Sequence, residues 1–161
     1  MANPVHRGDL PALAGLLALP FSAGILGSIA TASEVRGWYA TLAKPAFNPP
    51  SWVFGPVWTT LYILMAVSLW LVWRSPAPGA RASRIIWFVM VALNAAWSPV
   101  FFGLHRPDLA LIVIALYLAT LVALMRLLRD QSRPAFWLQV PHLLWVAFAG
   151  VLNAAIWRLN R

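Results

Sequence analysis

The sequence predicts an all-α integral membrane protein, a bundle of five transmembrane helices, and three observations lead to this fold class. Apolar residues make up 61% of the 161 residues and charged residues only 10%, whereas about a quarter of an ordinary soluble domain is charged. Five apolar stretches follow one another, each of about 20 residues, the length at which a helix crosses a hydrocarbon core of roughly 30 Å. All of the acidic residues fall outside these stretches.

The predicted spans are joined by short connections, so neighbouring helices are expected to pack antiparallel in one domain over residues 1–161. None of the stretches shows the alternation over about 10 residues that is typical of a transmembrane strand. The spans are Leu10 to Thr31, Trp52 to Trp73, Ile85 to Leu104, Leu109 to Leu128 and Leu138 to Trp157.

The first span also resembles a signal peptide, because Ala30-Thr31-Ala32 has the form of a processing site. However, its apolar run is longer than the usual core of about 7 to 15 residues, and Asp9 stands where a basic region is expected. We therefore expect this span to remain as the first helix.

The positive charge of the chain indicates contact with lipid. The formal net charge is +8, and basic loops beside a bilayer bind anionic headgroups, so membrane lipid is an expected partner and nucleic acid is not. The Lys and Arg residues split seven to five between the two sides, which favours a cytoplasmic N-terminus. The seven are Arg7, Arg74, Arg81, Arg84, Arg126, Arg129 and Arg133; the five are Arg36, Lys44, Arg106, Arg158 and Arg161.

Several kinds of chemistry are excluded by composition. The chain has no cysteine, and its three histidines, His6, His105 and His142, are scattered over a tail, a loop and a helix. No metal site and no required cofactor are therefore expected. Ion-coupled transporters hold ionisable groups at membrane depth, so the absence of acids from the spans makes a channel or ion-coupled transporter the least favoured function. No acid–base pair or activated nucleophile is visible for ordinary catalysis.

Aromatic residues are the remaining source of specific chemistry. Between Trp38 and Tyr62 a proline-rich loop, which contains the chain's only lysine, Lys44, is followed by an aromatic helix. This composition is suited to a pocket for a flat, partly charged ligand. Trp at a span end is usually a headgroup anchor, but Trp58, Trp97 and Trp145 lie one or two turns inward. Each shares a helix face with polar or small residues: Tyr62 and Met65; Asn94 and Phe101; His142, Ala149 and Asn153.

These motifs resemble the tryptophan-rich sensory protein and translocator protein family, TspO/MBR, also called the peripheral benzodiazepine receptor family. The resemblance covers nearly the whole chain and rests on three multi-residue motifs: Trp38-Tyr39 with Lys44-Pro45, Phe47, Pro49-Pro50, Trp52, Phe54, Trp58 and Leu61-Tyr62; Asn94-Ala95-Ala96-Trp97-Ser98-Pro99 with Phe101-Phe102-Gly103; and Pro141, Trp145, Phe148-Ala149, Leu152-Asn153 and Trp157-Arg158.

The resemblance implies a five-helix bundle, commonly a homodimer, that binds porphyrin or haem as its ligand and acts as a receptor or carrier of tetrapyrroles. The expected location is the cell membrane of a bacterium. The alternative function that it implies is a light- and oxygen-dependent enzyme that degrades porphyrin with Trp58 and Trp145. Carried over by motif, the ligand-binding residues are Trp58, Asn94, Trp97, Trp145, Ala149, Phe54, Phe101 and Lys44, with the segment Lys44 to Pro50 as a lid.

Two departures from the family pattern change what is expected. Ala154 stands where cholesterol-binding animal members carry a tyrosine, so no cholesterol function is predicted. His142 stands where relatives usually carry a tyrosine; an imidazole is a common haem ligand, but a hydrogen bond to a neighbouring helix is the favoured role. Small residues that recur every fourth position in the third and fourth spans are compatible with a dimer but leave its face open: Ala92 and Ala96; Ala115, Ala119 and Ala123.

Overall fold

The computed structural model describes residues 10–161, apart from the side chain of Ala30, so His6, Arg7 and Asp9 lie outside the described part. Helices account for most of this part, which contains no strand. The elements are α1 (Leu10–Arg36), α2 (Trp38–Thr41), α3 (Ser51–Trp70), α4 (Ala80–Ser98), the π-helix η2 (Pro99–Gly103), α5 (Pro107–Gln131), α6 (Arg133–Leu138) and α7 (Val140–Leu159).

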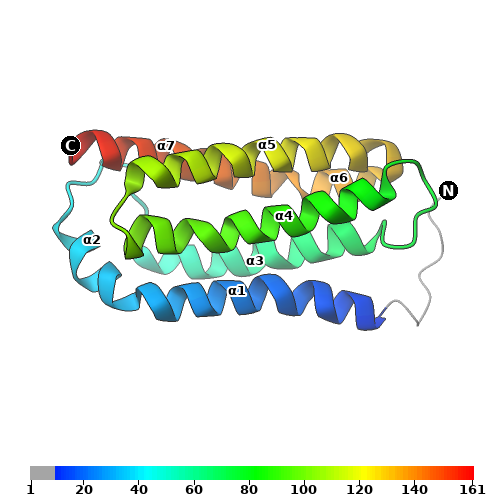
Figure 1. Ribbon diagram of the computed structural model, residues 1–161, viewed down its shortest axis with the longest axis horizontal. Coiled ribbons are helices and arrows are strands. Elements are labelled where there is room, and N and C mark those ends of the chain that lie inside the picture. The colour runs from blue at the N-terminus through cyan, green and yellow to red at the C-terminus, as the bar shows by residue number, and fades with distance from the viewer. Residues whose placement is uncertain (1–9) are drawn as a thin grey trace.

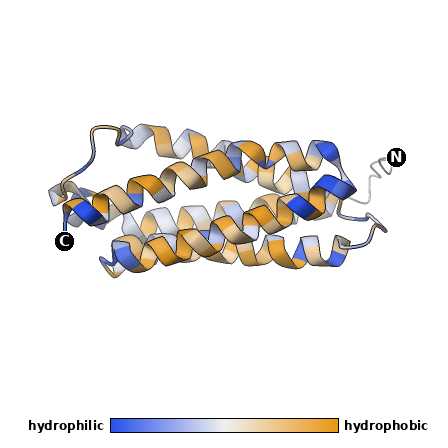
Figure 2. Cartoon of the chain, turned by 90° about the horizontal axis from the view of Figure 1, so that it is seen from above, coloured by the Kyte–Doolittle hydropathy of each residue, from blue (hydrophilic) through white to orange (hydrophobic). Residues whose placement is uncertain are grey.

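The five predicted spans are confirmed as long helices that run up and down one bundle (Figure 1). Five of the described helical segments are long and apolar enough to cross a membrane: Leu10–Ile29, Ser51–Trp70, Ala80–Gly103, Pro107–Gln131 and Arg133–Leu159. Apolar residues cover most of their length, and charged residues gather at the ends (Figure 2). The protein is therefore a multi-pass membrane protein.

Two span boundaries differ from the sequence-based prediction. The third helix begins at Ala80 rather than Ile85, since Arg81 and Arg84 do not end the helix but occupy its first turns. The fifth span is two helices, α6 and α7, that meet at Gln139. Pro141 explains this break, because a proline has no N–H to donate to the carbonyl four residues earlier.

The core lies where α5 packs between α4 and α7, while α1 lies outermost, against α3 and α4. Fully buried apolar side chains fill this core, among them Met65, Met90 and Leu121. The Trp87 indole is also fully buried and donates a hydrogen bond from Nε1 to the Met65 carbonyl over 3.1 Å. Because no water reaches such a core, each buried donor that finds a carbonyl avoids a desolvation cost.

The end of the bundle opposite the α3–α4 turn is covered by α2 and the loop 42–50. Trp38, Tyr39 and Leu42 pack there on a cluster centred on the buried Phe101. Asn160, just after α7, clasps the loop: its Oδ1 accepts from the Ala43 N–H over 2.9 Å, and its Nδ2 donates to the Ala43 carbonyl over 2.9 Å. The loop is thus fixed to the last turn of the last helix.

Candidate ligand-binding site

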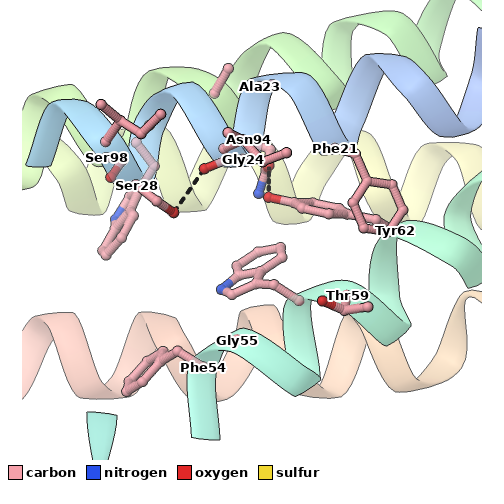
Figure 3. A pocket seen from close by; sticks show the side chains of 16 residues that line it. Phe21, Ala23, Gly24, Ser28, Phe54, Gly55, Thr59, Tyr62, Asn94 and Ser98 are labelled. Atoms are coloured by element: carbon pink, nitrogen blue, oxygen red, sulfur yellow. Dashed lines mark hydrogen bonds between the residues drawn. The ribbon is translucent and has the colours of Figure 1, made fainter. Parts of the chain in front are cut away.

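A cavity of about 380 Å³ lies between α1, α3 and α4, toward the end of the bundle that α2 covers. Figure 3 shows its walls: Phe21, Gly24 and Ser28 come from α1, and Phe54 and Tyr62 from α3. The full lining is Phe21, Ala23, Gly24, Ile25, Gly27, Ser28, Ile29, Phe54, Gly55, Trp58, Thr59, Tyr62, Asn94, Ala95, Trp97 and Ser98. Most of these side chains are apolar or aromatic, and a few hydroxyl and amide groups stand among them.

A glycine in α1, Gly24, lets a wall residue of this cavity approach the helix closely. A Cβ added at Gly24 would lie 2.7 Å from Tyr62 Cε2, closer than real atoms approach, and one at Gly27 would lie 3.7 Å from the Ser98 Cβ. The absence of a side chain at Gly24 therefore lets the Tyr62 ring lie flat against α1. Phe21, one turn before Gly24, packs edge-on against the same ring at 5.5 Å.

Hydrogen bonds fix Tyr62, Asn94 and Trp97 in the wall. The Tyr62 hydroxyl donates to Asn94 Oδ1 over 3.1 Å, which joins α3 to α4. The Trp97 indole donates from Nε1 to Asn153 Oδ1 over 3.1 Å, and Asn153 in turn donates to the Pro107 carbonyl over 2.8 Å. Trp97 is thus held by α7 and α5 in one orientation, with its ring at the cavity.

The structure brings four of the residues predicted from the sequence to this cavity: Phe54, Trp58, Asn94 and Trp97 line it. Phe101 does not line it but is buried behind Trp97, stacked on that indole at 5.1 Å. It therefore supports the cavity wall through its contact with Trp97.

Trp145 and Ala149 are placed elsewhere. Trp145 lines a second, more open hollow of about 630 Å³ between α3 and α7, and its ring lies edge-on to that of the cavity residue Phe54 at 5.8 Å. Ala149, one turn further along α7, lines neither hollow. The second hollow is walled by Pro49, Pro56, Val57, Thr60, Leu61, Pro141, Leu144, Trp145 and Phe148.

Lys44 lies in the covering loop and lines neither hollow. Its ammonium donates to the carbonyls of Leu42 over 3.1 Å and Ala40 over 3.4 Å, and it sits 4.7 Å from the centre of the Tyr39 ring. Tyr39 also holds the loop through a hydrogen bond, since its hydroxyl donates to Asn48 Oδ1 over 3.0 Å. Burial raises the pKa of Tyr39, so this hydroxyl keeps its proton and remains a donor.

A model of the TspO/MBR family matches residues 16–158 of the chain. The chain belongs to the TspO/MBR family. It is 38% identical to the tryptophan-rich protein TspO of Archaeoglobus fulgidus over 152 residues, which cover 94% of this chain and 97% of that protein. It is 35% identical to the translocator protein of Bos taurus over 150 residues, 91% of this chain and 89% of that protein. Protein CrtK of Rhodobacter capsulatus is 38% identical over 125 residues, 76% of this chain and 78% of that protein.

In this TspO/MBR member, His142 is fully buried and both of its ring nitrogens have partners. Nε2 lies 2.7 Å from the Tyr117 hydroxyl, and Nδ1 lies 3.1 Å from Gln139 Oε1. The favoured role, a hydrogen bond to a neighbouring helix, agrees with this geometry, because Tyr117 belongs to α5. Among the described residues, no group of three or more His, Cys, Asp and Glu side chains could hold a metal ion.

The sequence-based prediction missed the contribution of α1 to the cavity, which comprises seven of its lining residues, Phe21 to Ile29 without Ser22 and Leu26. A signal was present in the sequence: Gly24, Gly27 and Ser28 form a run of small residues in the first span. Small residues at such spacing permit a close approach of helices. From the sequence alone, this run of small residues could mark either a contact between two helices or the wall of a cavity.

Proposed function

We propose that this protein is a membrane receptor or carrier that binds tetrapyrroles, porphyrin or haem, in the cavity between α1, α3 and α4, and that it acts in their regulation or transport. The observation that carries the proposal is an aromatic cavity of about 380 Å³ inside a membrane bundle. This size falls within the range of roughly 300–1,000 Å³ that ligand pockets occupy. Indole and phenyl faces stack well on a broad apolar disc.

The cavity has an open side and lies near cations at the membrane surface, and both features fit a tetrapyrrole. The cavity is not fully enclosed, so a disc larger than the hollow can project from it. The propionates of a tetrapyrrole need cations at the water boundary. Arg36, at the exposed end of α1, lies seven residues beyond the lining residue Ile29, about 10 Å along the helix axis. Lys44 lies at the same boundary and stays a predicted contact.

A homodimer is part of the proposal. Most of the small residues that recur at every fourth position are exposed, namely Ala92 and Ala96 on α4 and Ala115 and Ala119 on α5, while Ala123 is half-buried. Small residues allow helix backbones from two protomers to approach closely. The ligand, the partner protomer and the surrounding lipid are thus the proposed partners.

Titration of the purified protein with protoporphyrin IX and with haem, followed by the absorbance of the ligand, tests the proposal. Trp58→Ala and Trp97→Ala remove stacking surface and are expected to weaken binding about tenfold each. Trp137→Ala is the matched control, because this indole is 64% exposed and lies on α6, away from the cavity. An unchanged ligand spectrum in the wild-type protein, or equal losses in the control, contradicts the proposal.

The alternative is a light-dependent reaction in which dioxygen is the oxidant and the bound porphyrin is oxidised, while an indole quenches or relays the radical. The observation in its favour is an oxidisable pair at the wall, Trp58 and Tyr62, with ring centres 5.5 Å apart. The complex is illuminated under oxygen and the porphyrin absorbance is followed. Equal loss in the wild type and in Trp58→Phe and Trp145→Phe assigns the loss to free photochemistry and removes the enzymatic alternative.

A further inference from the structure

A chain of polar side chains leads from the cavity wall across the bundle. At the wall, the Tyr62 hydroxyl donates to Asn94 Oδ1 over 3.1 Å, and both residues line the cavity. Deeper in the bundle, the Tyr117 hydroxyl of α5 lies 2.7 Å from His142 Nε2. His142 Nδ1 lies 3.1 Å from Gln139 Oε1. We call these five residues the polar chain.

The chemistry of the groups sets the direction of each hydrogen bond in the polar chain. The amide oxygen of Gln139 can only accept, so His142 carries its proton on Nδ1 and leaves Nε2 bare. A bare nitrogen must accept, so the Tyr117 hydroxyl donates to it. At the cavity wall, Asn94 Oδ1 accepts from the Tyr62 hydroxyl. The Tyr117 and His142 donors therefore both point toward Gln139.

The two ends of the polar chain are unlike. Tyr62 and Asn94 face the cavity, where a ligand can reach them. The other end is Gln139, a fully buried residue at the elbow between α6 and α7, whose Nε2 has no hydrogen-bond partner. An unpaired donor in a low-dielectric interior is costly, so a rearrangement that gives Nε2 a partner is favoured. The elbow therefore holds a buried donor that a rearrangement of the polar chain can pair.

We infer that the polar chain reports the occupancy of the cavity to the α6–α7 elbow. A ligand oxygen that accepts from Tyr62 or Asn94 competes with their mutual hydrogen bond and displaces the Tyr62 ring, whose centre lies 5.5 Å from that of the Trp58 ring. Trp58 passes this change on, because its ring lies edge-on to His142 at 6.3 Å. The inference rests on the proposed function only in taking this cavity as the ligand site.

The first test needs no ligand. Tyr62→Phe removes the hydroxyl that begins the polar chain, and the ring ¹⁵N resonances of His142 are expected to shift. The chain has only two other histidines, His6 and His105, and the His105 resonances serve as the internal reference. Thr59→Val is the matched control, a cavity residue outside the polar chain. Unchanged His142 resonances in Tyr62→Phe, or an equal shift in Thr59→Val, overturn the inference.

The second test measures coupling to the ligand. Tyr117→Phe and His142→Phe are each expected to weaken protoporphyrin IX binding by about fivefold or more, although neither residue lines the cavity. The double variant is expected to lose no more than either single variant, since all three break the same chain. Ser68→Ala is the control, because its buried hydrogen bond to the Ala135 carbonyl, 2.8 Å long, lies outside the chain.

The outcomes separate the two proposals. A wild-type protein that binds no porphyrin contradicts the proposed function, while the His142 resonances of Tyr62→Phe still decide the coupling. Additive losses in Tyr117→Phe and His142→Phe contradict the coupling, while the wild-type titration still supports the function. If these variants fold poorly, Gln139→Leu replaces them, because it removes the acceptor at the far end without touching the cavity and is likewise expected to weaken protoporphyrin IX binding. Unchanged binding in Gln139→Leu contradicts the coupling.

Discussion

At the scale of single residues, the shape of the cavity depends on Gly24, which has no side chain. A methyl group at Gly24 would meet the Tyr62 ring at 2.7 Å and its hydroxyl oxygen at 2.8 Å. Gly24→Ala must therefore push Tyr62 away from α1, against Trp58 on its other side and against its bond to Asn94. We expect a loss of stability of about 1–3 kcal/mol, the usual cost of overpacking, measured by denaturant titration in detergent micelles.

Gly15 on the same helix supplies the control. A Cβ added there meets nothing within 4 Å, and alanine is the better helix former by about 0.5–1 kcal/mol. Gly15→Ala is thus expected to leave the stability unchanged or raise it. If both variants behave alike, the close approach of Tyr62 to α1 does not matter to stability.

The sequence predicted individual site residues only in part. Spacing on a helix shows which side chains share a face, so Asn94 and Trp97 were expected together, and both line the cavity. Spacing does not show which neighbour that face meets. For this reason Trp145 was assigned to the same site as Trp58, whereas α7 turns it toward the second hollow.

At the scale of elements, hydrogen bonds from Asn160 attach the loop 42–50 to the end of α7. The Asn160 amide makes two hydrogen bonds of 2.9 Å to Ala43 and one of 2.7 Å to the Ile156 carbonyl. Asn160→Ala removes all three, each worth about 0.5–1.5 kcal/mol at most. We expect faster amide hydrogen exchange in the loop, with little change in the transmembrane helices, measured by mass spectrometry.

Arg161→Ala is the neighbouring control for this experiment. Its guanidinium lies over the Trp157 ring of α7, 5.0 Å from the ring centre. Exchange in the loop is expected to stay as in the wild type. Equal acceleration in the two variants would assign the effect to fraying of the chain end instead of the clasp.

The sequence predicted which long helices form better than it predicted where they begin and end. Length and hydropathy sufficed for the spans, because a bilayer accepts only apolar helices of nearly fixed length. Hydropathy misplaced the start of α4, since Arg84 donates to the Trp73 carbonyl over 2.7 Å and continues the helix into the interface. It also missed the elbow at Gln139, because an apolar run looks the same whether or not proline interrupts its hydrogen bonds.

At the scale of the whole molecule, the bundle has two chemically different ends. Among the described residues, one end carries Arg74, Arg81, Arg84, Arg126, Arg129 and Arg133 with a single acid, Asp130. The opposite end carries Arg36, Lys44, Arg106, Arg158 and Arg161 with two acids, and one of these, Asp108, forms a 2.6 Å ion pair with Arg106. The excess of positive charge therefore lies at the α3–α4 and α5–α6 turns.

This asymmetry predicts the orientation of the protein, because loops rich in Lys and Arg stay in the cytoplasm. The chain has no cysteine, so single-cysteine variants report on one position each. Pro78→Cys, exposed in the α3–α4 turn, is expected to react with a membrane-impermeant maleimide only after the cells are permeabilised. Ala46→Cys, exposed in the loop 42–50, is expected to react in intact cells. The reverse pattern would place the arginine-rich end outside, and the covered end of the cavity would then face the cytoplasm.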